Sequence, residues 1–299
     1  MKPSRRAFLK TTSAALLTTS TLTQTRNLFA AQKTLRLPLA LQLYSVRALL
    51  PKDYDGTLGE IAALGYREVE AAGYFNHTGA EVNQAMAAAS LKLVGSHHSS
   101  DDLHKKLDEI IAFNKEAGVS YIICASPGHK DPSAPVNPDR NHAFTLDDWR
   151  WNADQLNQFA EKVIAAGMRF GYHNHTPEFH EIDGVIPYDE LLRLTDPAKV
   201  TFEMDCGWVI VGGGNPIDYL RNYPTRISML HVKDFKPDTN PPIPAELGQG
   251  HIDYAPIFAQ AAKSSHIQHC FVEQEGFNMP PTQSLKVDAD YMRKLGILS

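Results

Sequence analysis

Short apolar runs alternate with longer segments of helical periodicity from about residue 37 to the end of the chain. Most of the short runs are continuously apolar rather than alternating, which is typical of parallel strands covered on both faces. The predicted strands are residues 37–44, 68–71, 91–95, 121–125, 169–173, 200–205, 227–232 and 270–273.

A helix is predicted after each of these strands. Glycine follows several of the helical segments, as expected for a C-cap. Two aspartates lie near the start of two of the longest ones, where they complement the helix dipole. The predicted helices are residues 57–64, 80–89, 101–117, 145–166, 188–194, 216–222, 254–263 and 285–295.

Eight strand–helix units predict a right-handed parallel repeat, either a closed barrel or an open doubly wound sheet. No G-x-G-x-x-G motif follows the first strand, and no P-loop or interdomain linker is present. We therefore predict an α/β fold with one domain, a (β/α)₈ barrel over residues 34–299. Two long loops, 126–144 and 236–253, follow strands and should lie on the C-terminal face, where barrel active sites form.

The first 33 residues form a separate segment. Residues 4–10 read Ser-Arg-Arg-Ala-Phe-Leu-Lys, and a Thr- and Ala-rich stretch follows to about residue 22. This pattern is typical of a twin-arginine (Tat) signal, although a basic disordered tail is the plain alternative. The sequence thus predicts that residues 1–33 are a Tat signal peptide and disordered leader, cleaved near Ala30 and Ala31, and that the protein is periplasmic or otherwise exported.

Composition narrows the range of partners. Of the 299 residues, 43% are hydrophobic and 21% charged, as in soluble globular proteins. A net charge of −5 without a basic run argues against nucleic acid, and no apolar stretch is long enough to predict a membrane span after processing. Cys124, Cys206 and Cys270 lie in or beside apolar runs, which favours buried free thiols. The assembly state stays open, with a homo-oligomer as one option.

The last four predicted strands end in residues that bind hard metal ions. Such groups are costly to bury without partners, and a barrel brings strand ends into one pocket. Carboxylates with imidazoles, and no clustered thiolates, suit a divalent Mn, Mg, Co or Zn ion. The candidates are His173, His175 and Glu178 from the fifth strand, Asp205 from the sixth, His231 from the seventh, and Glu273 or Glu275 from the eighth.

The fifth-strand ligand stays open among three side chains. A carboxylate completes a hard-metal site best, which favours Glu178 over His173 and His175. His175 then becomes a candidate general base, because an imidazole titrates near neutral pH. Asp205 could instead cap a turn, and His231 could be a satisfied core histidine.

Polar and aromatic residues at the other strand ends could line the same pocket. Glu70, His98 and His129 are as readily polar lining without a direct role, and Trp208 could either pack or stack on a sugar ring. The substrate-binding candidates are Gln42, Tyr44, His97, His173 and Trp208.

Several strings together resemble the xylose-isomerase-like sugar isomerase/epimerase barrels, whose relatives include inosose dehydratases and ketose 3-epimerases. The strings are GYHNH at 171–175, EF at 178–179, FEMDCGW at 202–208, HVKD at 231–234 and FVE at 271–273. The resemblance implies one divalent metal held by Glu178, Asp205, His231 and Glu273. One departure is His173, because many members of that family carry the first glutamate directly on the fifth strand.

The resemblance also implies a metal-dependent isomerase or epimerase that acts on a sugar or keto-sugar through an enediolate. His175 or Glu273 would be the base, and Lys233 would stabilise the developing charge. The alternatives are a lyase or deglycosidase of 3-keto-glycosides, a sugar-binding barrel without catalysis, and a phosphodiesterase or abasic-site nuclease.

Overall fold

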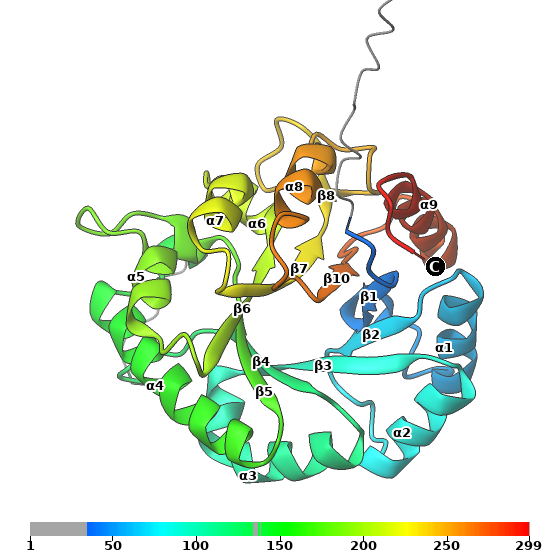
Figure 1. The fold of residues 1–299 in the computed structure, drawn as a ribbon, viewed down its shortest axis with the longest axis horizontal. Helices are drawn as coiled ribbons and strands as arrows, with labels where there is room; N and C mark the ends of the chain where they lie inside the picture. The colour runs from blue at the N-terminus through cyan, green and yellow to red at the C-terminus, as the bar shows by residue number, and fades with distance from the viewer. Residues whose placement is uncertain (1–34, 134–136, 138, 299) are drawn as a thin grey trace, which may run out of the picture. The chain divides into compact units, whose positions relative to one another are not determined.

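Eight parallel strands close into a barrel surrounded by helices in a computed structural model that describes residues 35–133, 137 and 139–298 (Figure 1). Each strand pairs with its neighbours in chain order, and the first pairs with the last, Ala40 opposite Phe271, to close the ring. The predicted (β/α)₈ barrel is therefore confirmed. The strands are β1 (Ala40–Gln42), β2 (Glu68–Ala71), β3 (Lys92–Ser99), β4 (Tyr121–Ser126), β5 (Arg169–His173), β6 (Val200–Asp205), β7 (Ile227–Val232) and β10 (His269–Val272).

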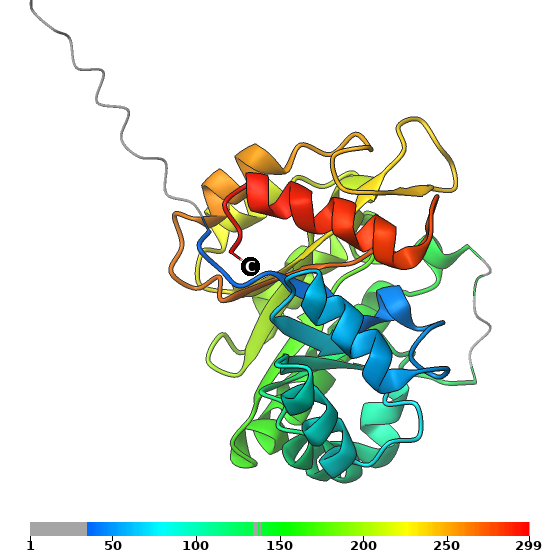
Figure 2. The same ribbon diagram turned by 90° about the vertical axis from the view of Figure 1, so that its right-hand side faces the viewer.

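The outer helices follow the strands around the ring. Figures 1 and 2 show α9 beside α1, so the two ends of the barrel domain meet; Arg293 of α9 donates to the Leu64 carbonyl just after α1. No helix in the described ranges has the length and apolarity needed to span a membrane. The helices are α1 (Tyr54–Ala63), α2 (Gly79–Ala88), α3 (Ser100–Glu116), α4 (Leu146–Ala165), α5 (Pro187–Leu194), α6 (Cys206–Val211), α7 (Pro216–Asn222), α8 (Tyr254–Ala261) and α9 (Pro281–Lys294), with short 3₁₀ turns η1 (Leu43–Val46), η2 (Arg140–His142) and η3 (Pro177–Phe179).

The barrel interior changes from apolar to polar along the strands. Its middle is filled by a buried apolar cluster that includes Met229 and Phe271. Two residues further along, the same faces of the strands carry His231 and Glu273, because side chains alternate along a strand. The apolar cluster consists of Ala40, Val94, Tyr121, Ile123, Met229 and Phe271.

Several elements differ from the sequence prediction: β3 runs on to Ser99, four residues beyond its predicted end, and α1 and α9 begin three and four residues early. The first predicted strand, residues 37–44, is a strand only over Ala40–Gln42, because the Gln42 side chain accepts a bond from the Tyr44 amide and starts η1. The apolar segment Cys206–Val211 forms α6, which the prediction left out. Its N-terminus is capped by Asp205.

The long loop after β7 is held by one buried carboxylate. Asp234 accepts backbone N–H bonds from Phe235, Gly248, Gly250 and Ile252, at 2.9 to 3.1 Å. A Cβ at position 250 would lie 2.1 Å from Asp234 Oδ1, so this close approach requires glycine. Within the loop, β8 (Asp234–Phe235) and β9 (Pro244–Ala245) form a short antiparallel pair. The segment is therefore held to the end of β7 by its own backbone hydrogen bonds.

Candidate metal centre

Four buried side chains from consecutive barrel strands converge at the C-terminal end of the barrel. His173, Asp205, His231 and Glu273 each offer one ligand atom, and these atoms all lie within 4.8 Å of one another. The strand pairing explains the convergence, since Asp205 is the register partner of His231 and Phe271 faces His231 two residues before Glu273. This donor set of two imidazoles and two carboxylates suits a divalent transition-metal ion.

Asp205 uses its two oxygens differently. Oδ1 accepts the Trp208 backbone N–H at 2.8 Å and caps α6. Oδ2 is buried without a hydrogen-bond partner among the described residues, although the Lys233 ammonium lies 2.9 Å away. Asp205 can therefore both cap a turn and serve as a metal ligand, because Oδ1 makes the cap and Oδ2 is directed into the cluster. A buried carboxylate oxygen without a bond fits a metal ligand.

Lys233 is a fixed positive charge beside the four side chains. Its Nζ lies 2.9 Å from both Asp205 Oδ2 and Glu273 Oε2 and 2.5 Å from Glu275 Oε1. Burial lowers the pKa of Lys233, but the three carboxylates outweigh burial and raise it. A Cβ at Gly207 would lie 2.4 Å from the Lys233 side chain, so that glycine leaves room for the lysine.

A second polar layer lies on the interior side of these residues. Glu203 Oε2 is 2.8 Å from His97 Nε2, 3.0 Å from His173 Nδ1 and 3.2 Å from His231 Nε2. Glu70 Oε2 is 2.8 Å from His97 Nε2 and 2.9 Å from His231 Nε2, and it accepts a bond from the Gln42 amide. Gln42 and His97, predicted to bind substrate, are thus linked to the cluster through two carboxylates.

In this layer, positively charged imidazolium groups balance the negative charges of the carboxylates. Burial lowers the pKa of His97, but Glu70 and Glu203 outweigh it and raise that pKa to about 10. Burial raises the pKa of Glu203, yet His231 and the other imidazoles hold it well below its ordinary value. His173 is the exception, because burial and the charge of His231 lower its pKa, so it is neutral.

The sequence prediction did not single out Glu203 as a site residue. Glu203 stands two positions before Asp205, so alternation along β6 places both on the inner face of the barrel. This two-residue spacing is the sequence signal that could have identified Glu203 as a site residue.

His175 lies at the rim, next to His173, with their ring centroids 4.9 Å apart. It is partly exposed and stands near Trp208, at 6.2 Å between ring centroids. Burial, followed by the Lys233 charge, lowers its pKa to about 3. The predicted base is therefore an uncharged proton acceptor at neutral pH.

Glu178 is not among the four converging side chains, although its Oε2, like Asp205 Oδ2, is buried without a hydrogen-bond partner in the described part of the chain. Its Oε1 accepts the Tyr172 hydroxyl at 2.6 Å, and Tyr172 belongs to the outward apolar core of β5. Burial raises the pKa of Glu178 to about 7. Two groups of side chains are spaced to hold a metal ion, and neither includes Glu178. They are the four converging side chains and a second, overlapping group of His97, His173, Glu203 and His231. The fifth-strand residue that the structure brings to the cluster is His173.

The remaining candidates lie away from the cluster. Tyr44 is exposed, with the Arg47 guanidinium 3.9 Å from its ring centroid. His98 contacts Ser96 and Asn114 on the outside of the barrel. His129 stacks on Phe144 in the loop after β4.

Comparison with known proteins agrees with the barrel fold. The model of the family "Xylose isomerase-like TIM barrel" matches residues 58–295. The chain belongs to this family. Inosose dehydratase from Geobacillus kaustophilus is 28% identical over 249 residues, covering 74% of this chain and 80% of the relative.

Solved structures of the xylose isomerase-like family share the architecture. A sugar phosphate isomerase/epimerase from Parabacteroides distasonis has a TM-score of 0.69 and 25% identity, covering 87% of this chain and 94% of its own. An IOLI protein with a bound zinc atom has a TM-score of 0.67, with coverage of 87% and 98%. Its identity is 13%, so that likeness concerns the fold.

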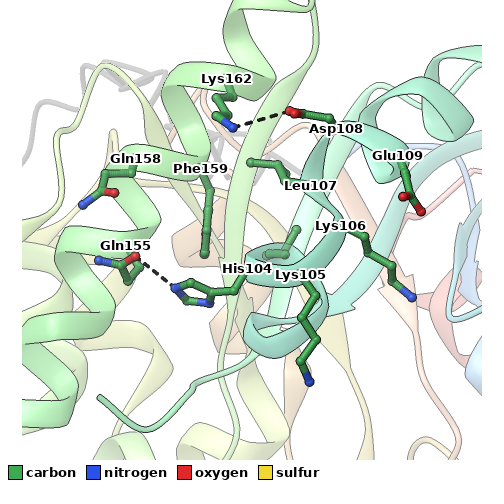
Figure 3. Close-up of a pocket in the computed structure, with 11 residues that line it drawn as sticks. His104, Lys105, Lys106, Leu107, Asp108, Glu109, Gln155, Gln158, Phe159 and Lys162 are labelled. Carbon is green, nitrogen blue, oxygen red and sulfur yellow. Dashed lines mark hydrogen bonds and ion pairs between the residues drawn. The ribbon is translucent and has the colours of Figure 1, made fainter. Parts of the chain in front are cut away.

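Two surface clefts of this xylose isomerase-like barrel lie elsewhere. One, of about 350 Å³, runs between α3 and α4 (Figure 3). Two pairs of its polar side chains contact each other, His104 with Gln155 and Lys162 with Asp108. The other, of about 440 Å³, lies at the starts of β4, β5 and β6, at the opposite end of the barrel. Neither cleft is lined by the four converging side chains. The candidate site is therefore identified by its residue types and their spacing rather than by the size of a cleft.

Proposed function

We propose that this barrel is a divalent-metal-dependent enzyme that removes a proton next to the carbonyl group of a sugar-like keto compound. The observation that carries the proposal is the buried convergence of His173, Asp205, His231 and Glu273, in which Asp205 Oδ2 has the Lys233 ammonium 2.9 Å away and no hydrogen bond within the described part of the chain.

In this proposal His173 takes the place that the sequence analysis favoured for Glu178. His173 Nε2 lies 3.9 Å from Asp205 Oδ2, whereas Glu178 bonds to Tyr172. Two imidazoles with two carboxylates suit Zn²⁺, Mn²⁺ or Co²⁺ better than Mg²⁺, which prefers oxygen ligands.

A bound divalent ion would supply Lewis-acid polarisation of the substrate carbonyl. His175 is outside the ligand set and uncharged, so it is available to accept the proton from the neighbouring carbon, but its pKa of about 3 makes it a weak base. Glu273, ionised beside Lys233, is the second candidate base. The Lys233 ammonium donates hydrogen bonds toward an oxygen that gains negative charge.

Loss of a hydroxyl group from the next carbon is the favoured outcome, so the reaction is a dehydration by a lyase. The reason is that eight curated relatives, at 20–28% identity, are inosose dehydratases. Isomerisation or epimerisation, which the sequence analysis placed first, is the second candidate, and the Parabacteroides distasonis structure favours it. The proton-removal step is common to both.

The test is NMR in D₂O with metal-loaded protein and a panel of keto-inositols and free, phosphorylated and 3-keto sugars. Elimination produces an unsaturated or deoxy-keto product that has lost one hydroxyl group as water. Isomerisation or epimerisation keeps every hydroxyl and incorporates deuterium. Asp205→Asn is the matched control and should be inactive; equal turnover by this variant and the wild type would refute the proposal.

We also propose that the enzyme acts after export. The twin-arginine segment that motivates this lies outside the described residues. Fusion of residues 1–33 to a reporter that requires twin-arginine export tests it, with Arg5→Lys/Arg6→Lys as the control that should stay inside the cell.

A further inference from the structure

We propose that Glu203 is a positioning residue that directs the metal-binding nitrogen of His173 toward the metal centre. The inference rests on the proposed metal centre and deepens it. Glu203 contacts no converging carboxylate and reaches the centre only through imidazoles. It acts by fixing which ring nitrogen carries the proton.

Glu203 can act only as an acceptor. Its side chain is wholly buried, and its Oε2 faces three imidazole nitrogens at 2.8 to 3.2 Å. An ionised carboxylate has no proton to donate, so each close nitrogen must present an N–H to it. The strand register supports this arrangement, since Glu203 of β6 is the direct partner of His173 of β5.

His173 has one proton for two nitrogens when it is neutral. Its Nδ1 lies 3.0 Å from Glu203 Oε2, and its Nε2 is the nitrogen on the Asp205 side, 3.9 Å from Oδ2. A proton on Nε2 would leave two lone pairs facing each other across the Nδ1–Oε2 contact. Glu203 therefore holds the proton on Nδ1 and leaves the Nε2 lone pair available to a metal ion, as outer carboxylates do for metal-binding histidines.

His231 depends less on Glu203. Its Nε2 lies 2.9 Å from Glu70 Oε2 and 3.2 Å from Glu203 Oε2, so a second carboxylate accepts the same N–H. Its Nδ1 is then the nitrogen directed to Glu273, at 2.9 Å. The effect of Glu203 should thus pass mainly through His173, for which Glu203 is the one carboxylate at Nδ1 among the described residues.

The first experiment measures Zn²⁺ affinity of the purified protein by competition with a chelator. Glu203→Gln should bind Zn²⁺ about 10- to 100-fold more weakly than the wild type. The matched control is Glu246→Gln, another buried carboxylate, which bonds Asn278 and Ser284 and contacts none of the converging ligands. It should bind Zn²⁺ like the wild type, and thermal unfolding of the metal-free variants checks that both are folded.

A second pair of variants separates positioning from a merely structural role. His173→Glu places a carboxylate ligand beside Glu203, where the two negative charges repel each other. Adding Glu203→Gln to that variant removes the repulsion and supplies an amide donor, so the double variant should bind Zn²⁺ more tightly than His173→Glu alone. The effect of Glu203→Gln therefore changes sign between the two backgrounds.

Nitrogen-15 NMR of the metal-free wild type gives an independent readout, which should show His173 protonated at Nδ1. A proton on Nε2, or an equal loss of affinity on Glu203→Gln in both backgrounds, would overturn the positioning role. Wild-type protein that binds no Zn²⁺ would overturn the metal centre itself, and the two failures are thus distinct.

Discussion

Replacing Glu178 with glutamine separates two roles for this carboxyl group, a metal ligand and a buried group that holds a proton. In the structure its Oε1 accepts the Tyr172 hydroxyl, and burial raises its pKa from the ordinary 4.5 to about 7. Below about pH 4.5 both the folded and the unfolded chain carry the proton. Between pH 4.5 and 7 the unfolded chain releases it while the folded chain keeps it, so stability falls as pH rises.

The size of the effect follows from the pKa difference of about 2.5. At about 1.4 kcal/mol for each pKa step of one, Glu178 should cost the folded state about 3 kcal/mol above pH 7. Glutamine cannot ionise, so Glu178→Gln should gain about that much relative to the wild type between pH 4.5 and pH 8. The new amide group can also change the free energy of unfolding by an amount that is the same at every pH. Such an amount does not affect the predicted gain between pH 4.5 and pH 8.

The assay is urea unfolding of metal-free protein at a series of pH values, comparing the free energies of unfolding of the two proteins. Asp288→Asn is a matched control, because that buried carboxyl also has its pKa raised to about 7 but bonds Leu247, away from the metal centre. Parallel pH profiles for Glu178→Gln and the wild type would refute the reasoning. A loss of Zn²⁺ binding in Glu178→Gln would support Glu178 as a metal ligand, as the sequence analysis predicted.

Three further predictions concern the metal centre and its surroundings. Asp205→Asn and His231→Ala should each lower the bound metal and reduce turnover at least about a thousandfold, because several kcal/mol of charge stabilisation are lost. Metal analysis and the NMR assay measure these two effects. Full activity with normal metal content would contradict the prediction. Zn²⁺ at about 100 times its dissociation constant should stabilise the wild type by about 2.7 kcal/mol in urea unfolding, and Asp205→Asn should show no such gain. Asp234→Ala removes the acceptor of four backbone N–H groups and should make residues 236–253 the first site of limited proteolysis. Asp253→Ala, at the exposed cap of α8, is the control and should leave this loop resistant.

The barrel could be predicted because its strands and helices obey local rules. Six of the eight barrel strands end within one residue of the sequence prediction, at Ala71, Ser126, His173, Asp205, Val232 and Val272. The first strand is shorter because a side-chain bond from Gln42 to the backbone ends it. Such a competition between a side chain and the strand ladder is a three-dimensional outcome that an apolar run does not reveal.

The converging residues could be predicted only where the strand itself fixes them. Asp205, His231 and Glu273 lie at strand ends, so closure of the barrel brings them together. Glu178 is five residues beyond the end of β5, and the turn η3 determines where it goes. That turn places its carboxyl against Tyr172, on the outward side of β5, which spacing along the sequence could not show.

The hydrogen bonds that join the two ends of the barrel domain have a consequence for its topology. Leu39 donates to the Leu298 carbonyl at 2.5 Å, and Leu298 donates to the Leu37 carbonyl at 2.9 Å. A short linker could therefore connect these segments while the chain is opened in another loop. Such a circular permutant should keep every converging side chain at its own strand end, because the order of strands around a closed ring does not depend on where the chain begins.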